Sequence, residues 1–357
     1  MSTNTETVTG TGTAAGIGPA PAAPPAGPAA VDRPGPRRRA GLCHLLLRRA
    51  RGALGPGGRL IAGSAVVCAA LMALAPWLPN GPVNLASLWQ TVMPWSGLGI
   101  SLLLLLAALR RSVPAAVAVL LPALVWTCLF APALLDKREG GGDFTVVSHN
   151  VNEGNPDPGR TARALAGSGA DVVAVEELAS RAQEAFRREL AAAYPYSQVN
   201  GGIGLWSKYP LQAVEPVEIM PWTRAVRATV LTPKGPVALY AAHLASVRVR
   251  PDAGFTTADR NRAAARLAAA VGSEPLPRVV VLGDLNGSFD DTALRTLTGP
   301  LRSAQEEAGA GFGFTWPASF PVVRIDQILV KGVTPRSAWT LPDTGSDHLP
   351  VAASLRL

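Results

Sequence analysis

The sequence predicts an α/β domain that follows three membrane-spanning helices. Two apolar stretches, 60–109 and 112–135, contain no charged residue and together are long enough for three spans. From residue 144 onward, short runs rich in valine alternate with helical patterns, which is typical of a mixed sheet covered by helices. With 357 residues, the chain is long enough to form both parts.

The N-terminal region has two compositions. Residues 1–36 are mostly alanine, glycine, proline, threonine and serine, a composition that buries too little apolar surface to offset chain entropy. We therefore predict a disordered tail. Residues 37–59 carry seven arginines and no acidic residue, which predicts a basic flank on the cytoplasmic side of a membrane. The alternative, a nuclear-import or nucleic-acid signal at residues 37–39, is less favoured.

The membrane region is predicted to cover residues 60–135, with spans at 60–79, 89–109 and 112–135. A helix rises ~1.5 Å per residue, so ~20 residues cross the hydrocarbon core. The sequence PNGPVN predicts a turn between the first two spans. The alternative is a signal peptide cleaved after Ala75, but Pro76 disfavours cleavage, and the later spans would still anchor the chain.

Basic residues beside the spans predict the orientation. Arginines flank the first span on its N-terminal side, Arg110 and Arg111 lie between the second and third spans, and the first connection carries none. Because basic segments stay in the cytoplasm, we expect a multi-pass cell-membrane protein with a cytoplasmic N-terminus. Three spans then place the C-terminal domain on the extracytoplasmic side.

Residues 136–142, which include KREGGG, predict a linker, and residues 143–357 predict the soluble domain. The expected strands are FTVVSHNV, DVVAVEEL, GIGLWS, ATVLTP, VALYAAHL, RVVVLGDLN, RIDQILV and LPVAASLRL. The expected helices lie near 159–165, 181–193, 257–271 and 290–297.

The formal charge of +8 does not extend to the soluble domain. From residue 140 onward there are 21 basic and 21 acidic residues, so the excess belongs to the N-terminal part. Nucleic acid is therefore the less favoured partner. The three cysteines, Cys43, Cys68 and Cys128, all precede residue 140 and lack metal-type spacing, so we interpret them as apolar fillers.

Polar side chains recur at the ends of the predicted strands. A buried strand rarely ends in such groups unless they are paired or functional. Each one alone has a structural explanation, such as a turn or a helix start. Six such ends in one domain favour a functional site, and their polar residues are His149, Asn150, Asn152, Glu176, Glu177, His243, Asp284, Asn286, Asp326, Asp347 and His348.

The order of these motifs resembles the endonuclease/exonuclease/phosphatase superfamily, which includes DNase I-like nucleases, inositol polyphosphate 5-phosphatases and neutral sphingomyelinases. The matching elements are HNV, DVVAVEEL, GLWSKYPL, AAHL, GDLN, RID and the terminal SDHLP. The resemblance covers about residues 144–357. It implies an α/β fold built as a four-layer α/β/β/α sandwich, and a metal-dependent phosphoric ester hydrolase.

The resemblance also implies a metal site. Hard oxygen ligands suit Mg²⁺, with Mn²⁺ as the alternative, and phosphoryl transfer needs a cation to spread the phosphoryl charge. Glu177 is the leading candidate ligand. The amide oxygen of Asn150 is expected beside it, and Asp347 is expected to add a ligand directly or through water.

The catalytic roles follow the same resemblance. Asp284 is expected to orient or deprotonate the attacking water, and Asn286 to donate to a phosphoryl oxygen. Asp326 would hold the imidazole of His348, which pairs with a phosphoryl oxygen or acts as a general acid or base. His243 would contact the phosphate from a neighbouring strand. Asn286, His243 and His348 are thus also the expected substrate-binding residues.

Two positions depart from the family pattern. Residue 176 is Glu where the family often has Gln, which adds a carboxylate beside the metal site. Asn152 stands where some branches carry an acidic metal ligand, so this position lacks the carboxylate that a second metal site would use.

The substrate prediction combines the neutral domain with its membrane tether. We expect a phosphorylated, lipid-linked substrate at the outer face, such as a polyprenyl diphosphate. The arrangement also looks like the actinomycete membrane proteins linked to teicoplanin resistance, which implies a connection to cell-wall precursor recycling. Two alternatives are kept: an extracytoplasmic metal-dependent nuclease, and a non-catalytic binding protein on a degenerate phosphatase fold.

Overall fold

The computed structural model of the chain describes residues 9–11 and 55–357. The predicted tail lies outside the described residues apart from 9–11, and so does the predicted basic flank apart from 55–59. All helices and strands of the described part of the chain lie in residues 55–357.

Three helices that are long and apolar enough to cross a membrane precede the domain, as predicted. They cover Pro56–Ala73, Leu85–Leu109 and Val113–Leu134. The first is α2 (Pro56–Ala73), the second comprises α3 (Leu85–Val92), η2 (Met93–Trp95) and α4 (Ser96–Leu109), and the third is α5 (Val113–Leu134).

Three predicted span boundaries differ from the helices by four residues or more. The first helix begins at Pro56, four residues before the predicted start. The first helix ends at Ala73 instead of 79, because Pro76 cannot continue the helical hydrogen bonds and lies in the 3₁₀ turn η1 (Ala75–Trp77). The second begins at Leu85, four residues before the predicted start, because the segment LASLWQTV is itself helical and forms α3. Residues 136–142 contain no helix or strand.

The domain contains two six-stranded mixed sheets. In spatial order, the first consists of β13 (Thr334–Thr340), β14 (Val351–Arg356), β1 (Phe144–Asn150), β2 (Val172–Glu176), β4 (Ile203–Ser207) and β3 (Tyr196–Asn200). The second consists of β11 (Arg302–Ser303), β12 (Asp326–Lys331), β10 (Val279–Asp284), β7 (Gly235–Ala242), β6 (Ala225–Thr232) and β5 (Leu211–Pro216). Two short strands, β8 (Val249–Arg250) and β9 (Gly254–Phe255), pair separately.

The central strand pairs set which strand ends meet. Strand β1 runs parallel to β2, and β10 runs parallel to β7. Strand β14 pairs antiparallel with β1, and β12 pairs antiparallel with β10. The last strand of the chain is therefore an interior strand, held between β13 and β1. Its pairing explains why residues near the C-terminus can take part in a well-ordered site.

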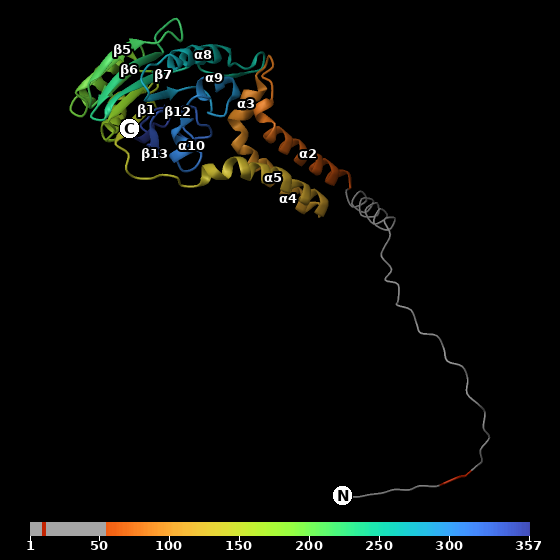
Figure 1. The fold of residues 1–357 in the computed structure, drawn as a ribbon. Helices are drawn as coiled ribbons and strands as arrows, with labels where there is room; N and C mark the ends of the chain where they lie inside the picture. The colour runs from red at the N-terminus through yellow and green to blue at the C-terminus, as the bar shows by residue number, and fades with distance from the viewer. Residues whose placement is uncertain (1–8, 12–54) are drawn as a thin grey trace. The chain divides into compact units, whose positions relative to one another are not determined.

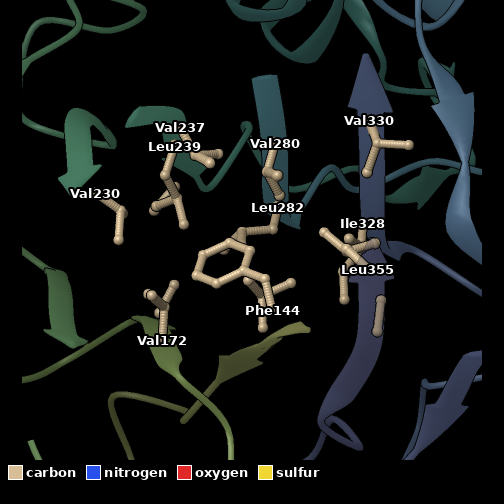
Figure 2. Packing of buried hydrophobic residues seen from close by; sticks show 14 of the residues in the cluster. Phe144, Val172, Val230, Val237, Leu239, Val280, Leu282, Ile328, Val330 and Leu355 are labelled. Atoms are coloured by element: carbon tan, nitrogen blue, oxygen red, sulfur yellow. The ribbon is translucent and has the colours of Figure 1, made fainter. Parts of the chain in front are cut away.

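The two sheets pack face to face through an apolar layer. Figure 2 shows the ring of Phe144 among aliphatic side chains that come from both sheets, including Val172, Leu239 and Leu282. Alternate residues of β10 serve different layers, because side chains of a strand point to opposite faces. Val280 and Leu282 face the other sheet, whereas Val279 and Val281 face the helices, which is why the strand reads VVVL.

Helices cover both outer faces. Helices α6 (Pro158–Ala166) and α7 (Gln183–Leu190) pack on the first sheet. The short 3₁₀ turn η3 (Ser180–Ala182) leads directly into α7. Helices α8 (Ala258–Gly272) and α9 (Arg295–Thr298) pack on the second, with η4 (Thr292–Leu294) before α9 (Figure 1). Helix α10 (Ala304–Ala308) follows β11. The predicted four-layer α/β/β/α sandwich is confirmed.

Gly283 allows two parallel strands to approach closely at the site end of the second sheet. Its φ is +142°, and a Cβ there would overlap the carbonyl oxygen of Ala242 on β7. We expect Gly283→Ala to lower the free energy of unfolding by at least about 2 kcal/mol, from backbone strain and overpacking. Denaturant unfolding of the full chain in detergent measures this value.

Gly272→Ala is the matched control. Gly272 ends α8, has no heavy atom within 4 Å of a built Cβ, and does not require a left-handed backbone. Its substitution should leave the stability unchanged or raise it, because alanine favours helices. Equal stabilities of the two variants would contradict the close-approach explanation.

Candidate active site

The predicted site residues converge at one edge of the sandwich. Asn150 is paired in register with Glu176 at the ends of β1 and β2, and Asp284 with Asp326 at the ends of β10 and β12. Parallel strands end at the same edge, and an antiparallel neighbour begins there. The strand directions therefore bring together residues that lie almost 200 positions apart in the sequence.

Asp326, His348 and Asp284 form a buried cluster. The Nδ1 atom of His348 lies 2.9 and 3.1 Å from the two carboxylate oxygens of Asp326. Its Nε2 atom lies 3.9 Å from Oδ2 of Asp284. All three side chains are buried. The predicted pairing of Asp326 with His348 is thus present in the structure.

The cluster shifts the pKa of two of its members. Burial alone would lower the pKa of His348, but the charge and hydrogen bond of Asp326 outweigh it and raise that pKa to about 10. Burial, and then the neighbouring charge of Asp326, raise the pKa of Asp284 to about 7. Near neutral pH, His348 is therefore a proton donor, and Asp284 can take up or release a proton.

Asn150, Glu177 and His243 surround Asp284. The amide nitrogen of Asn150 donates to Oδ2 of Asp284 at 3.1 Å. The Nε2 atom of His243 lies 3.5 Å from both Glu177 Oε1 and Asp284 Oδ2. Burial lowers the pKa of His243 well below its usual value, so this imidazole is neutral. These contacts join the ends of both sheets.

Asn286 lies in the turn that follows β10. Its backbone N–H donates to Oδ1 of Asp284 at 2.8 Å, and its side-chain amide donates to the carbonyl of Leu244 at 3.1 Å. The predicted donation to a phosphoryl oxygen would require the amide to share or leave this hydrogen bond. That role stays a prediction.

Three site residues other than glycine have a left-handed backbone. The φ angles are 59° for Asn152, 54° for Glu177 and 48° for Asn286. Such conformations cost of order 1–3 kcal/mol and persist where the surrounding structure enforces them. The turns after β1, β2 and β10 are therefore strained at the positions where the candidate ligands and the candidate phosphate contact lie.

Two further polar residues of these strand ends, Glu176 and His149, are buried and neutral. Burial raises the pKa of Glu176 well above its usual value, and Ser148 Oγ donates to its Oε1 at 3.0 Å. A neutral Glu176 resembles the glutamine that the family often has there, and it adds no charge beside the metal site. His149 lies 2.8 Å from Thr344 Oγ1, and burial lowers its pKa to about 3.

The residues present fit a divalent cation. Asp284, Asp326 and His348 each offer a donor atom, and these atoms lie within 4.8 Å of one another. Glu177, Asn150 and Asp284 are linked through the contacts above and provide the oxygen donors that Mg²⁺ prefers. Asp347 is exposed and lies outside the Asp284–Asp326–His348 group. Its predicted role as a ligand, like those of Glu177 and Asn150, stays a prediction.

Arg224 was missed by the sequence analysis. The residue immediately precedes β6, and its Nη2 atom lies 3.2 Å from Nε2 of His243. It lines a cavity of about 540 Å³ together with Glu177, His243 and the exposed Trp222. An arginine at the head of a buried strand, 19 residues before His243, was the available signal.

Several solved structures are similar to this chain in fold. A humanized TDP2 of D. rerio is 18% identical, with a TM-score of 0.51 over 60% of this chain and 99% of that chain. A D. rerio TDP2 complexed with a single-strand DNA product gives 0.50 at 18% identity, over 60% and 99%. Sphingomyelinase C from Streptomyces griseocarneus gives 0.45 at 20% identity, over 59% and 98%. No curated protein sequence matches the chain.

The sequence of residues 147–348 matches the Endonuclease/Exonuclease/phosphatase family, and this match covers more than half of the chain. The matched segment runs from β1 to His348 and contains every strand end that contributes to the cluster. The chain therefore belongs to the endonuclease/exonuclease/phosphatase family of metal-dependent phosphoester hydrolases.

Proposed function

We propose that this protein is a membrane-anchored, metal-dependent phosphohydrolase that cleaves a phosphoester or diphosphate bond of a lipid-linked substrate at the outer membrane face. The observation that carries the reaction type is the His348–Asp326 pair beside Asp284, buried at the meeting point of two sheets. This arrangement provides a proton donor and a proton acceptor on neighbouring side chains.

The candidate roles follow from the geometry. Asp326 holds Nδ1 of His348, so that the Nε2–H group is directed to the side of Asp284 and can donate to a phosphoryl oxygen. Asp284, with its pKa near 7, accepts a proton from the attacking water. Asn286 and His243 contact the phosphate. A divalent cation held by Glu177, Asn150 and Asp347 would spread the negative charge of the phosphoryl group.

Contacts between the apolar helices and the domain support a substrate in the membrane. Trp95, at the start of α4, donates through Nε1 to the carbonyl of Val322 at 2.7 Å. In the same loop Trp316 is 40% exposed and Phe320 is 68% exposed. Ala318 of this loop donates to the carbonyl of Asp347 at 2.8 Å. One loop thus joins a membrane helix, exposed aromatic side chains and the His348 segment.

The proposal also includes an extracytoplasmic orientation of the domain and a link to glycopeptide resistance. The basic residues beside the spans support the extracytoplasmic placement of the domain. The neutral charge of the domain supports a lipid-linked rather than a nucleic-acid substrate. Recycling of a polyprenyl carrier would be consistent with both.

We expect His348→Ala to lower metal-dependent phosphate release by about 10²–10⁴-fold, the usual contribution of a general acid or base. Asp326→Asn should lower it as well, since the imidazole then loses its charged partner. Steady-state release of phosphate by the full chain in detergent measures both. Asp252→Asn removes an exposed carboxylate that pairs with Arg250, and it should retain full activity. Full activity in His348→Ala would support the non-catalytic binding protein instead.

We expect the full chain in lipid vesicles to release phosphate from a polyprenyl diphosphate in the presence of Mg²⁺ or Mn²⁺, and to lose this activity when a chelator is added. Supercoiled plasmid is assayed in parallel at the same ionic strength. Nicking of plasmid without turnover of the lipid would contradict the lipid substrate and indicate an anchored nuclease.

A further inference from the structure

Arg224 is a half-buried cation with few partners beside the candidate active site. Its Nε atom is buried and has no hydrogen-bond partner among the described residues. Among the described residues, its side chain has one hydrogen-bond contact, with Nε2 of His243 at 3.2 Å. Within residues 55–357, no carboxylate forms an ion pair with it at 4.0 Å or less. A guanidinium has five N–H donors, so most of those of Arg224 are free.

The free donors of Arg224 border a cavity of suitable size. The cavity of about 540 Å³ is lined by Glu177 and His243, and by Gly201 and Gly202. Trp222 lies at its rim with 59% of its surface exposed. The cavity therefore begins at the phosphate-contacting residues and opens toward solvent.

Charge decides what this cavity binds. Its acidic lining residues are Glu153 and Glu177, and the backbone N–H of Glu153 donates to Oε2 of Glu177. Glu177 is the leading candidate ligand of the divalent cation, which would neutralise it. Arg224 then has no carboxylate partner. Its planar guanidinium can bind a phosphate through two parallel hydrogen bonds.

We propose that Arg224 binds the second phosphate of a diphosphate substrate, while the site at Asp284 and His348 acts on the first. This inference rests on the proposed function and makes the substrate class more specific: a diphosphate ester rather than a simple phosphomonoester. The contact with His243 places the two phosphate positions next to each other, as the shared bridging oxygen of a diphosphate requires.

In the proposed reaction, water hydrolyses the diphosphate bond. The oxygen of water forms a bond to the terminal phosphorus, and the bond between that phosphorus and the bridging oxygen breaks. The electron pair stays on the bridging oxygen, which becomes a terminal oxygen of the lipid monophosphate held by Arg224. One proton of the water passes to Asp284, and the products are inorganic phosphate and the lipid monophosphate.

Direct binding tests the assignment independently of turnover. Isothermal titration of the full chain in detergent with Mg²⁺ uses methylenediphosphonate, a non-hydrolysable diphosphate, and inorganic phosphate as probes. Arg224→Gln should weaken binding of the diphosphonate about tenfold or more and weaken phosphate binding much less; Arg224→Lys should fall between. Arg250→Gln removes an exposed arginine that pairs with Asp252 and should bind like the wild type. Equal losses for both probes would overturn the proposal.

Kinetics distinguish this proposal from the proposed function. For Arg224→Gln, the kcat/KM ratio of polyprenyl diphosphate to polyprenyl monophosphate should fall at least about tenfold, mainly through KM. An unchanged ratio would show that Arg224 acts only through His243 or on the attacked phosphate. If the wild type turns over neither lipid, the proposed function fails, and the titration with methylenediphosphonate still decides the role of Arg224.

A second inference rests on a separate set of contacts, which joins α3 of the membrane region to the turn after β10. Ser87 is fully buried, and its Oγ donates to Oδ1 of Asp291 at 2.8 Å. Oδ2 of Asp291 forms an ion pair of 2.7 Å with the fully buried Arg260. Arg260 in turn donates through Nη1 to the carbonyl of Asn286 at 3.1 Å.

The neighbouring Gln90 strengthens this junction. Its side-chain oxygen accepts from Thr292 N at 2.9 Å, and its amide donates to the carbonyl of Ala75 at 2.6 Å. Buried polar groups with this many partners hold one arrangement, because each lost partner would leave an unsatisfied group. We infer that α3 is a positioning element that keeps the strained Asn286 turn in its active geometry.

Ser87→Ala in the full chain tests this positioning role. Hydrogen–deuterium exchange should rise in a peptide containing residues 284–287 and stay unchanged in β3, and kcat should fall more than KM changes. Ser87→Thr keeps the hydroxyl, so its hydrogen–deuterium exchange and its kcat should match those of the wild type. Thr91→Ala is the control, since Thr91 bonds only within its own helix. Unchanged exchange at 284–287 would overturn the inference, whatever the activity.

Discussion

The face-to-face packing of two sheets is the constraint on which the rest of this structure depends. Phe144, Val280 and their neighbours form the apolar layer, and the layer fixes how β1 lies over β10. Asp284 and Asp326 come from one sheet. Asn150 ends β1 of the other sheet, where Glu177 follows β2 and His348 precedes β14. A hydrogen bond such as Asn150 to Asp284 exists only because the two sheets present the same edge.

The polar residues at the site edge of the two sheets lower the stability of the fold, whereas the apolar layer between the sheets raises it. Burial and the neighbouring charge of Asp326 raise the pKa of Asp284, and the left-handed turns at Asn152, Glu177 and Asn286 cost free energy. Packing of the sheets enforces this arrangement, so that groups able to hold a cation and transfer a proton stay close together. The buried Arg260–Asp291 pair supports the edge from the side of α3.

Much of this arrangement could be predicted from the sequence. Strands such as VVVLGD are apolar on both faces, and their ends carry the residues of the GDLN, RID and SDH motifs. The interior strands and the Asp326–His348 pair could therefore be predicted. Edge strands such as β3 could not be predicted, because its segment YSQVN is polar and exposed. Arg224 was missed because its role depends on a cavity between strand ends that no local pattern reveals.

If the strand-end cluster directs water onto phosphorus, the position of the oxygen from that water in the products reveals it. Turnover of a polyprenyl diphosphate by the full chain in vesicles containing Mg²⁺ and ¹⁸O-labelled water, followed by mass spectrometry of the products, locates this oxygen. We expect one ¹⁸O atom in the released inorganic phosphate and none in the lipid. Label in the prenyl alcohol, which would indicate cleavage of the carbon–oxygen bond, would contradict it.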